Sequence, residues 1–111
     1  MEIKGNFWIE KEGKSFLGKG RIELLKKIEK YGSISKAAKE MKMSYKAAWD
    51  AVDIINKLSN NEVVEKVSGG KGGGGTRLTE YGKHLINVYE NAKKLYEEKL
   101  SEIEAYIKKE I

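Results

Sequence analysis

The apolar positions of this chain change their spacing along the sequence, and each spacing predicts a different element. Residues 3–9 alternate in part between apolar and polar, and a turn at 12–14 is followed by Ser-Phe-Leu. This pattern predicts a β-hairpin. From residue 19 to 31 the apolar residues instead recur every three or four positions, which is the period of a helix. We therefore expect a hairpin followed by a helix.

Two further helices follow with a short connection between them. Gly32 ends the first helix, and the Ser33 hydroxyl can cap the next by accepting a backbone N–H. Apolar residues at i, i+3, i+4 and i+7 predict a two-turn helix over 34–41, and Ser44 can cap a third helix from Tyr45 to about residue 59. Two helices joined by three or four residues form a helix-turn-helix, for which plain three-helix packing is the alternative.

A strand, a glycine-rich loop and a second strand are predicted next. Residues 62–67 are rich in valine, six of the seven residues 69–75 are glycine, and 76–78 read Thr-Arg-Leu. This layout after a third helix is typical of the wing of a winged helix. The glycine run does not match the phosphate loop of nucleotide-binding proteins, because no Gly-Lys-Ser/Thr stands at the required spacing. A flexible linker is the remaining alternative.

The last third of the chain predicts one long helix over 79–111, with Thr79 as its N-cap. Its apolar residues recur with a mean spacing of about 3.67, which gives a nearly straight stripe. Such a helix would be roughly 45 Å long, more than a domain of this size can cover. We expect the stripe to pack against a second copy of the chain, although its first two turns can cover their own domain. The stripe comprises Leu85, Tyr89, Ala92, Tyr96, Leu100, Ile103 and Ile107.

Composition excludes several classes of function. The 111 residues suit one domain, in which 1–78 form the hairpin and winged helix-turn-helix and 79–111 form its dimerisation helix. The chain has no cysteine and only one histidine, His84, so we expect no metal site, no cofactor and no enzyme activity. No apolar run approaches a membrane span and no signal-peptide pattern begins the chain, which favours the cytoplasm and no membrane partner.

The positive charge is concentrated in the first two thirds of the chain. Residues 1–78 hold 16 basic and ten acidic residues, whereas residues 79–111 hold six basic and seven acidic ones. A basic surface on a small domain suits nucleic acid, because neutralising phosphates releases counterions. Lysine-rich surfaces also serve solubility, so charge alone leaves both interpretations open.

Four segments of the chain together resemble a known family. They are Gly20-Arg-Ile-Glu-Leu-Leu, Gly32-Ser-Ile-Ser-Lys-Ala-Ala-Lys, Met43-Ser-Tyr-Lys-Ala-Ala-Trp-Asp, and the glycine-rich stretch from Ser68 to Gly82. These resemble the DNA-binding domain of the ModE family, molybdate-responsive transcriptional regulators with a LysR-like winged helix. The resemblance covers about residues 16 to 90.

The resemblance implies a homodimer, joined through N-terminal strands and the long C-terminal helix, that binds a near-palindromic operator in double-stranded DNA. Family members of the full type continue into molybdate-binding domains, whereas this sequence stops at Ile111. We therefore expect the DNA-binding half alone, without molybdate sensing. Any effector would have to bind elsewhere or on a separate effector-binding chain.

Candidate DNA-contacting residues follow from the docking of a helix-turn-helix, in which the first turns of the second helix face base edges. Lys46 suits a guanine or a phosphate, and Asp50 can accept from cytosine or orient Lys46. Trp49 can face the DNA or brace the wing. The predicted DNA-binding residues are Ser35, Lys36, Lys39, Ser44, Tyr45, Lys46, Trp49, Asp50 and, at the tip of the wing, Lys71 and Gly72; Arg77 is placed at the wing's base.

The sequence thus predicts a mainly α fold with small β elements, a winged helix-turn-helix carrying an N-terminal β-hairpin and a long C-terminal dimerisation helix. Its leading function is a sequence-specific DNA-binding transcriptional regulator that acts as a homodimer. Two alternatives remain open. One is a non-specific architectural DNA-binding protein, and the other is a protein-interaction adaptor on a winged-helix scaffold.

Overall fold

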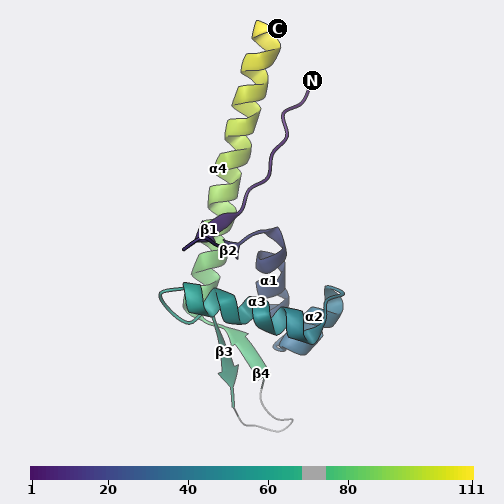
Figure 1. Ribbon diagram of the computed structural model, residues 1–111, viewed down its shortest axis with the longest axis vertical. Coiled ribbons are helices and arrows are strands. Elements are labelled where there is room, and N and C mark those ends of the chain that lie inside the picture. The colour runs from purple at the N-terminus through teal and green to yellow at the C-terminus, as the bar shows by residue number, and fades with distance from the viewer. Residues whose placement is uncertain (69–74) are drawn as a thin grey trace.

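The chain folds as a winged helix with an N-terminal hairpin and a long C-terminal helix, as the sequence predicts. The computed structural model describes residues 1–68 and 75–111 (Figure 1). Within these residues each strand pairs antiparallel with its neighbour in sequence. The elements in chain order are β1 (Ile9–Lys11), β2 (Lys14–Leu17), α1 (Lys19–Tyr31), α2 (Ile34–Glu40), α3 (Tyr45–Leu58), β3 (Val64–Val67), β4 (Gly75–Leu78) and α4 (Glu80–Glu110).

The N-terminal hairpin is shorter than the sequence pattern predicts. Its first strand begins at Ile9, and the expected strand over residues 3–8 is wrong: this segment is extended but unpaired and runs beside α4 (Figure 1). The Phe7 ring packs on two aromatic rings of α4, with centroid distances of 5.6 Å to Tyr89 and 5.4 Å to Tyr96. Phe7, an apolar residue of the predicted strand, therefore packs against α4 instead of pairing in a sheet.

The helix boundaries follow the local signals in the sequence. Gly32 ends α1 in the left-handed conformation, at φ 64°, which glycine adopts without a steric penalty. Ser33, Ser44 and Thr79 cap α2, α3 and α4, and each side chain accepts a backbone N–H from three residues further along, at 3.0–3.1 Å. These caps satisfy donors that a helix start leaves unpaired, so they fix where each helix begins.

The core lies where α1, α2 and α3 meet the base of the wing. Ala37 and Ala38 of α2 and Ala48 of α3 are fully or almost fully buried, and their small side chains let these two helices approach closely. The largest fully buried side chains are Leu24, Leu25, Ile28, Ile55 and Val63.

The wing is docked on the turn between α1 and α2. The Thr76 N–H donates to the Gly32 carbonyl at 3.0 Å. A Cβ atom built on Gly75 would lie 2.6 Å from the same carbonyl oxygen, so strand β4 reaches the turn because residue 75 has no side chain. Gly75, one glycine of the predicted wing, therefore lets the backbone of β4 come close to the backbone at Gly32.

Helix α4 belongs to the domain at its start and leaves it further on. Ile86 and the two stripe residues Leu85 and Tyr89 are buried in the chain's own core, whereas Leu95 is 68% exposed and Tyr106 is 65% exposed. The helix gives the molecule extents of 64 × 28 × 22 Å (Figure 1). In the part of the chain that the structure describes, no helix is long and apolar enough to cross a membrane.

An ion pair joins α1 to α4 beside this core. The Lys26 ammonium lies 2.7 Å from the Glu90 carboxylate, and this hydrogen bond raises the pKa of Lys26 above its usual value. Both side chains are roughly half exposed, so the pair adds little to the free energy of unfolding. Its main effect is to favour one orientation of α1 relative to α4.

The start of α4 touches the wing through a second glycine, Gly82. A Cβ atom there would lie 2.5 Å from the Val63 carbonyl oxygen and 2.9 Å from Leu78 Cγ. We expect Gly82→Ala to lower the free energy of unfolding by about 1–2 kcal/mol, because overpacking outweighs the better helix propensity of alanine. Urea unfolding followed by tryptophan fluorescence measures the change.

Gly20→Ala is the matched control, since Gly20 is also helical and has no described atom within 4 Å of its added Cβ. It is expected to stabilise the chain by roughly 0.5 kcal/mol. Equal effects of the two substitutions would contradict a close approach at Gly82.

Tyr89 is expected to make the free energy of unfolding depend on pH in alkaline solution. Burial raises the pKa of its phenol, with the nearby Glu90 and Glu97 carboxylates adding to the effect. The folded state therefore holds this proton more tightly than the unfolded state, whose tyrosine ionises near pH 10. We expect the stabilisation to be complete below about pH 10 and to be lost as the pH rises through the folded-state pKa. Unfolding free energies at pH 8, 10 and 11 should fall less steeply in Tyr89→Phe, and parallel declines would rule out this role.

Candidate nucleic-acid interface

Helix α3 lies across the domain above the wing, and its first turns lie next to α2 (Figure 1). Tyr45 is 56% exposed and Trp49 is 45% exposed, although both are large aromatic residues. The buried side of the same helix is occupied by Ala48, Val52 and Ile55. Because α3 buries one face in the core, its opposite face at the N-terminal end is left available to a partner.

The predicted pair of Lys46 and Asp50 is formed. The Lys46 Nζ lies 2.9 Å from Asp50 Oδ2 across one helical turn, and the lysine side chain is 85% exposed. The carboxylate accepts one of the three ammonium donors, which directs the lysine along the helix surface and leaves two donors for another acceptor. The geometry therefore supports the orienting role proposed for Asp50.

Helix α2 carries the predicted phosphate-contacting residues on its exposed face. The side chains of Ser35, Lys36 and Lys39 are exposed, whereas Ile34, Ala37 and Ala38 of the same helix are buried. The hydroxyl of Ser44 is engaged by the cap of α3, at 3.1 Å from the Ala47 nitrogen. The Ser44 hydroxyl therefore holds the start of α3, whose backbone N–H groups suit an anion.

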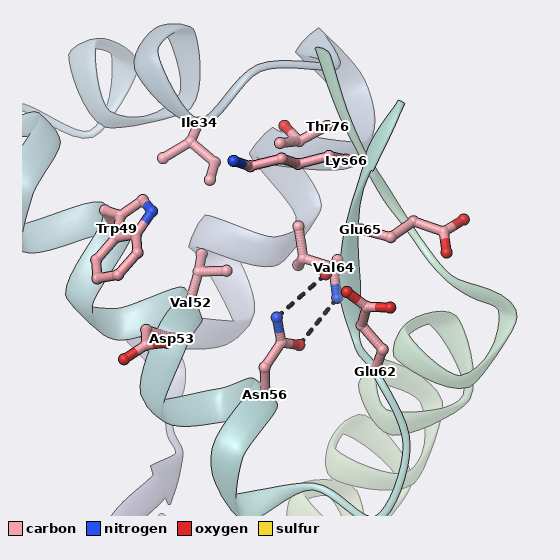
Figure 2. A pocket seen from close by; sticks show the side chains of 10 residues that line it. All are labelled: Ile34, Trp49, Val52, Asp53, Asn56, Glu62, Val64, Glu65, Lys66 and Thr76. Atoms are coloured by element: carbon pink, nitrogen blue, oxygen red, sulfur yellow. Dashed lines mark hydrogen bonds between the residues drawn. The ribbon is translucent and has the colours of Figure 1, made fainter. Parts of the chain in front are cut away.

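A groove separates α3 from the two strands of the wing (Figure 2). Its apolar side chains are Ile34, Trp49, Val52 and Val64, and Lys66 and Thr76 of the wing face it from the other side. Trp49 stands at the helix side of this groove, across from the wing. Trp49 is exposed and also lines the space beside the wing, so both roles that the sequence leaves open for it stay predictions.

Sequence reasoning missed the two wing residues Lys66 and Thr76. Alternation along a strand places Val64 and Lys66 on the same side, so the burial of Val64 towards α3 carries Lys66 to the groove. That signal is present in the sequence, but it depends on knowing which face of β3 is turned towards α3.

The remaining predicted wing residues divide into two groups. Arg77 lies at the wing's base, where its Nε atom is 2.6 Å from the Glu65 carboxylate on the paired strand. Lys71 and Gly72 lie outside the described residues. Near the C-terminal end of α3, Lys57 pairs at 2.7 Å with Asp53, which lines the groove, and this hydrogen bond raises the pKa of Lys57.

Known proteins resemble the N-terminal part of this chain closely. It is 52% identical to the DNA-binding transcriptional dual regulator ModE of Escherichia coli (strain K12) over 77 residues, which are 69% of this chain and 29% of the relative. The molybdenum transport protein ModE of Azotobacter vinelandii is 52% identical over 69 residues, which are 62% of this chain and 26% of that protein. The molybdenum-pterin-binding protein MopA of Rhodobacter capsulatus is 44% identical over 78 residues, or 70% and 29% of the two chains. No protein-family model matches the chain.

Over this segment the chain is a homologue of the ModE regulators. The chain spans less than a third of the length of these relatives. Identity near 50% over the N-terminal two thirds of the chain agrees with the winged-helix architecture. The likeness to ModE therefore concerns between 26% and 29% of the length of these relatives.

Proposed function

We propose that this chain is a sequence-specific DNA-binding transcriptional regulator of the ModE type. The observation that carries the proposal is the exposed first turns of α3, with Lys46 oriented by Asp50, beside a docked wing. The names of its relatives describe transcriptional regulators, and one of them is named as DNA-binding. This supports a binding module rather than an enzyme, acting on double-stranded DNA in the cytoplasm.

In the proposed complex α3 enters the major groove, which is wide enough to admit a helix. Tyr45, Lys46, Trp49 and Asp50 then face base edges, while Ser35, Lys36 and Lys39 of α2 and Ser44 at the start of α3 contact the phosphate backbone. The wing lies along the adjacent backbone, where Lys66 joins the predicted Lys71 and Gly72. Phosphate contacts fix the register, and the α3 side chains supply the sequence preference.

Fluorescence anisotropy with a duplex from the chain's own promoter region, against random duplex, tests the proposal at several salt concentrations. A regulator is expected to prefer its operator by roughly a thousandfold or more. A steep salt dependence with a preference near one would support the architectural alternative. Absence of binding to either duplex would favour the adaptor.

Lys46→Ala is expected to weaken operator binding by about tenfold, since one well-placed contact to a base contributes about 1–3 kcal/mol of discrimination. Lys108→Ala is the matched control, because Lys108 also forms an ion pair across one helical turn, at 3.0 Å from Glu104, near the far end of α4 (Figure 1). Anisotropy titrations on the same duplex compare the two. Equal affinities of both variants and the unmodified chain would exclude α3 as the reading helix.

We further propose that the chain binds DNA as a homodimer through α4. The exposed apolar face of this helix is wider than the predicted stripe. Val88, Leu95 and Tyr106 add a second row beside it, and all three are more than 40% exposed. The remaining stripe residues are Ala92, Tyr96, Leu100, Ile103 and Ile107, none of which is buried. Covering this face with a second copy removes apolar surface from water and pairs two α3 helices for a near-palindromic operator.

Leu95→Ala is expected to raise the dimer dissociation constant by about tenfold to a hundredfold, because each copy loses the burial of a leucine side chain. Lys94→Ala, a truncation on the side of the helix opposite the stripe, should leave it unchanged. Sedimentation equilibrium measures both, against a particle of twice the 12.6 kDa chain mass. A monomer at all concentrations would contradict the proposed dimer.

A further inference from the structure

The side chain of Asn56 joins α3 to the entry of the wing. Its Oδ1 atom accepts from the Val63 and Val64 N–H groups at 2.8 and 3.1 Å, and its Nδ2 donates to the Val64 carbonyl at 3.1 Å. Figure 2 shows the amide pointing from α3 to strand β3 across the inner end of the groove. Both acceptor positions of the amide oxygen are therefore used by one short piece of backbone.

These contacts are the link between the two parts of the proposed DNA-binding surface. Within the residues that the structure describes, every hydrogen bond between α3 and the β3 strand with its entry involves Asn56. Asn56 lies seven positions after Trp49, so both residues are on the side of α3 that lines the groove. Its side chain is only partly exposed, which shields the three hydrogen bonds from water.

The same backbone is held from its other side by α4. The Thr79 N–H donates to the Val63 carbonyl at 2.9 Å, and the Thr79 hydroxyl donates to the Glu62 carbonyl at 2.6 Å. Residues 62–64 are thus held between α3 and α4, and the hydrogen bonds on the α3 side are those of Asn56. If the Asn56 amide is removed, the wing keeps its hydrogen bonds to Thr79 and to the Gly32 carbonyl, while the hydrogen bonds that fix the entry of β3 to α3 are lost.

We infer that Asn56 is a positioning residue for DNA binding, which sets where the wing lies relative to α3. This inference rests on the proposed function. With the wing in this position, Lys46 on α3 and Lys66 on β3 can reach the same duplex together. Over the four residues of β3, a rotation of about 10° at Val64 moves the far end of the strand by roughly 2 Å. A shift of that size exceeds the tolerance of a hydrogen bond to a phosphate.

Asn56→Ala removes all three hydrogen bonds without changing the net charge. We expect it to weaken operator binding by about tenfold or more, and to reduce the slope of log K against log salt by about one for each phosphate that the wing no longer neutralises. Hydrogen exchange of the Val63 and Val64 amides in the full chain is expected to become faster.

Ile55→Val is the matched control for stability, because Ile55 is the neighbouring residue of α3 and is fully buried in the core. At a temperature where all variants are folded, it should leave the operator affinity and the salt slope unchanged. Unchanged affinity and slope in Asn56→Ala, with faster amide exchange, would overturn the inference. So would an equal loss of affinity in Ile55→Val.

The outcomes also separate this inference from the proposed function. If the unmodified chain binds no duplex, the proposed function fails whatever the exchange data show. If the unmodified chain binds its operator and Asn56→Ala binds it equally well, only the positioning role fails.

Discussion

The fold depends on the backbone around Val63, where α3 and the start of α4 are both hydrogen-bonded to one short segment. Its N–H is bound by Asn56 of α3, its carbonyl is bound by the Thr79 N–H at the start of α4, and its side chain is fully buried. Gly82 permits this approach because its missing Cβ leaves room for the Val63 carbonyl. An unpaired backbone group here would carry the cost of a broken hydrogen bond in the core, so the wing has little freedom at its base.

This arrangement explains why some features are predictable from the sequence and others are not. Helix starts at Ser33, Ser44 and Thr79 and the end at Gly32 depend on interactions within four residues, which a local pattern reveals. The extended segment before Ile9 resembles a strand in sequence, but Phe7 takes its partners from α4, more than 80 residues away. A short run of apolar residues does not show which distant surface will cover it.

The candidate site divides in the same way. Exposed residues at the start of α3 and on α2 follow from helix periodicity, since the buried face identifies the opposite one. Lys66 and Asn56 cannot be assigned from the sequence, because their roles require the packing of β3 against α3. As a cluster, the glycines suggest close approach to phosphates. Gly75 is the glycine of this cluster that the structure describes, and it packs against the Gly32 carbonyl.

The two roles proposed for α4 constrain each other. Its N-cap residue Thr79 is hydrogen-bonded to the entry of the wing, and the later turns of the helix carry the exposed apolar face. An α-helix of 31 residues is about 46 Å long and bends little, so its two ends move together. In the proposed dimer, the pairing of two α4 helices therefore determines the separation of the two wings and, through Asn56, of the two α3 helices. The centres of two major-groove half-sites are separated by one helical turn of DNA, about 34 Å, or by a multiple of it. The register in which two α4 helices pair would therefore select the spacing of the operator.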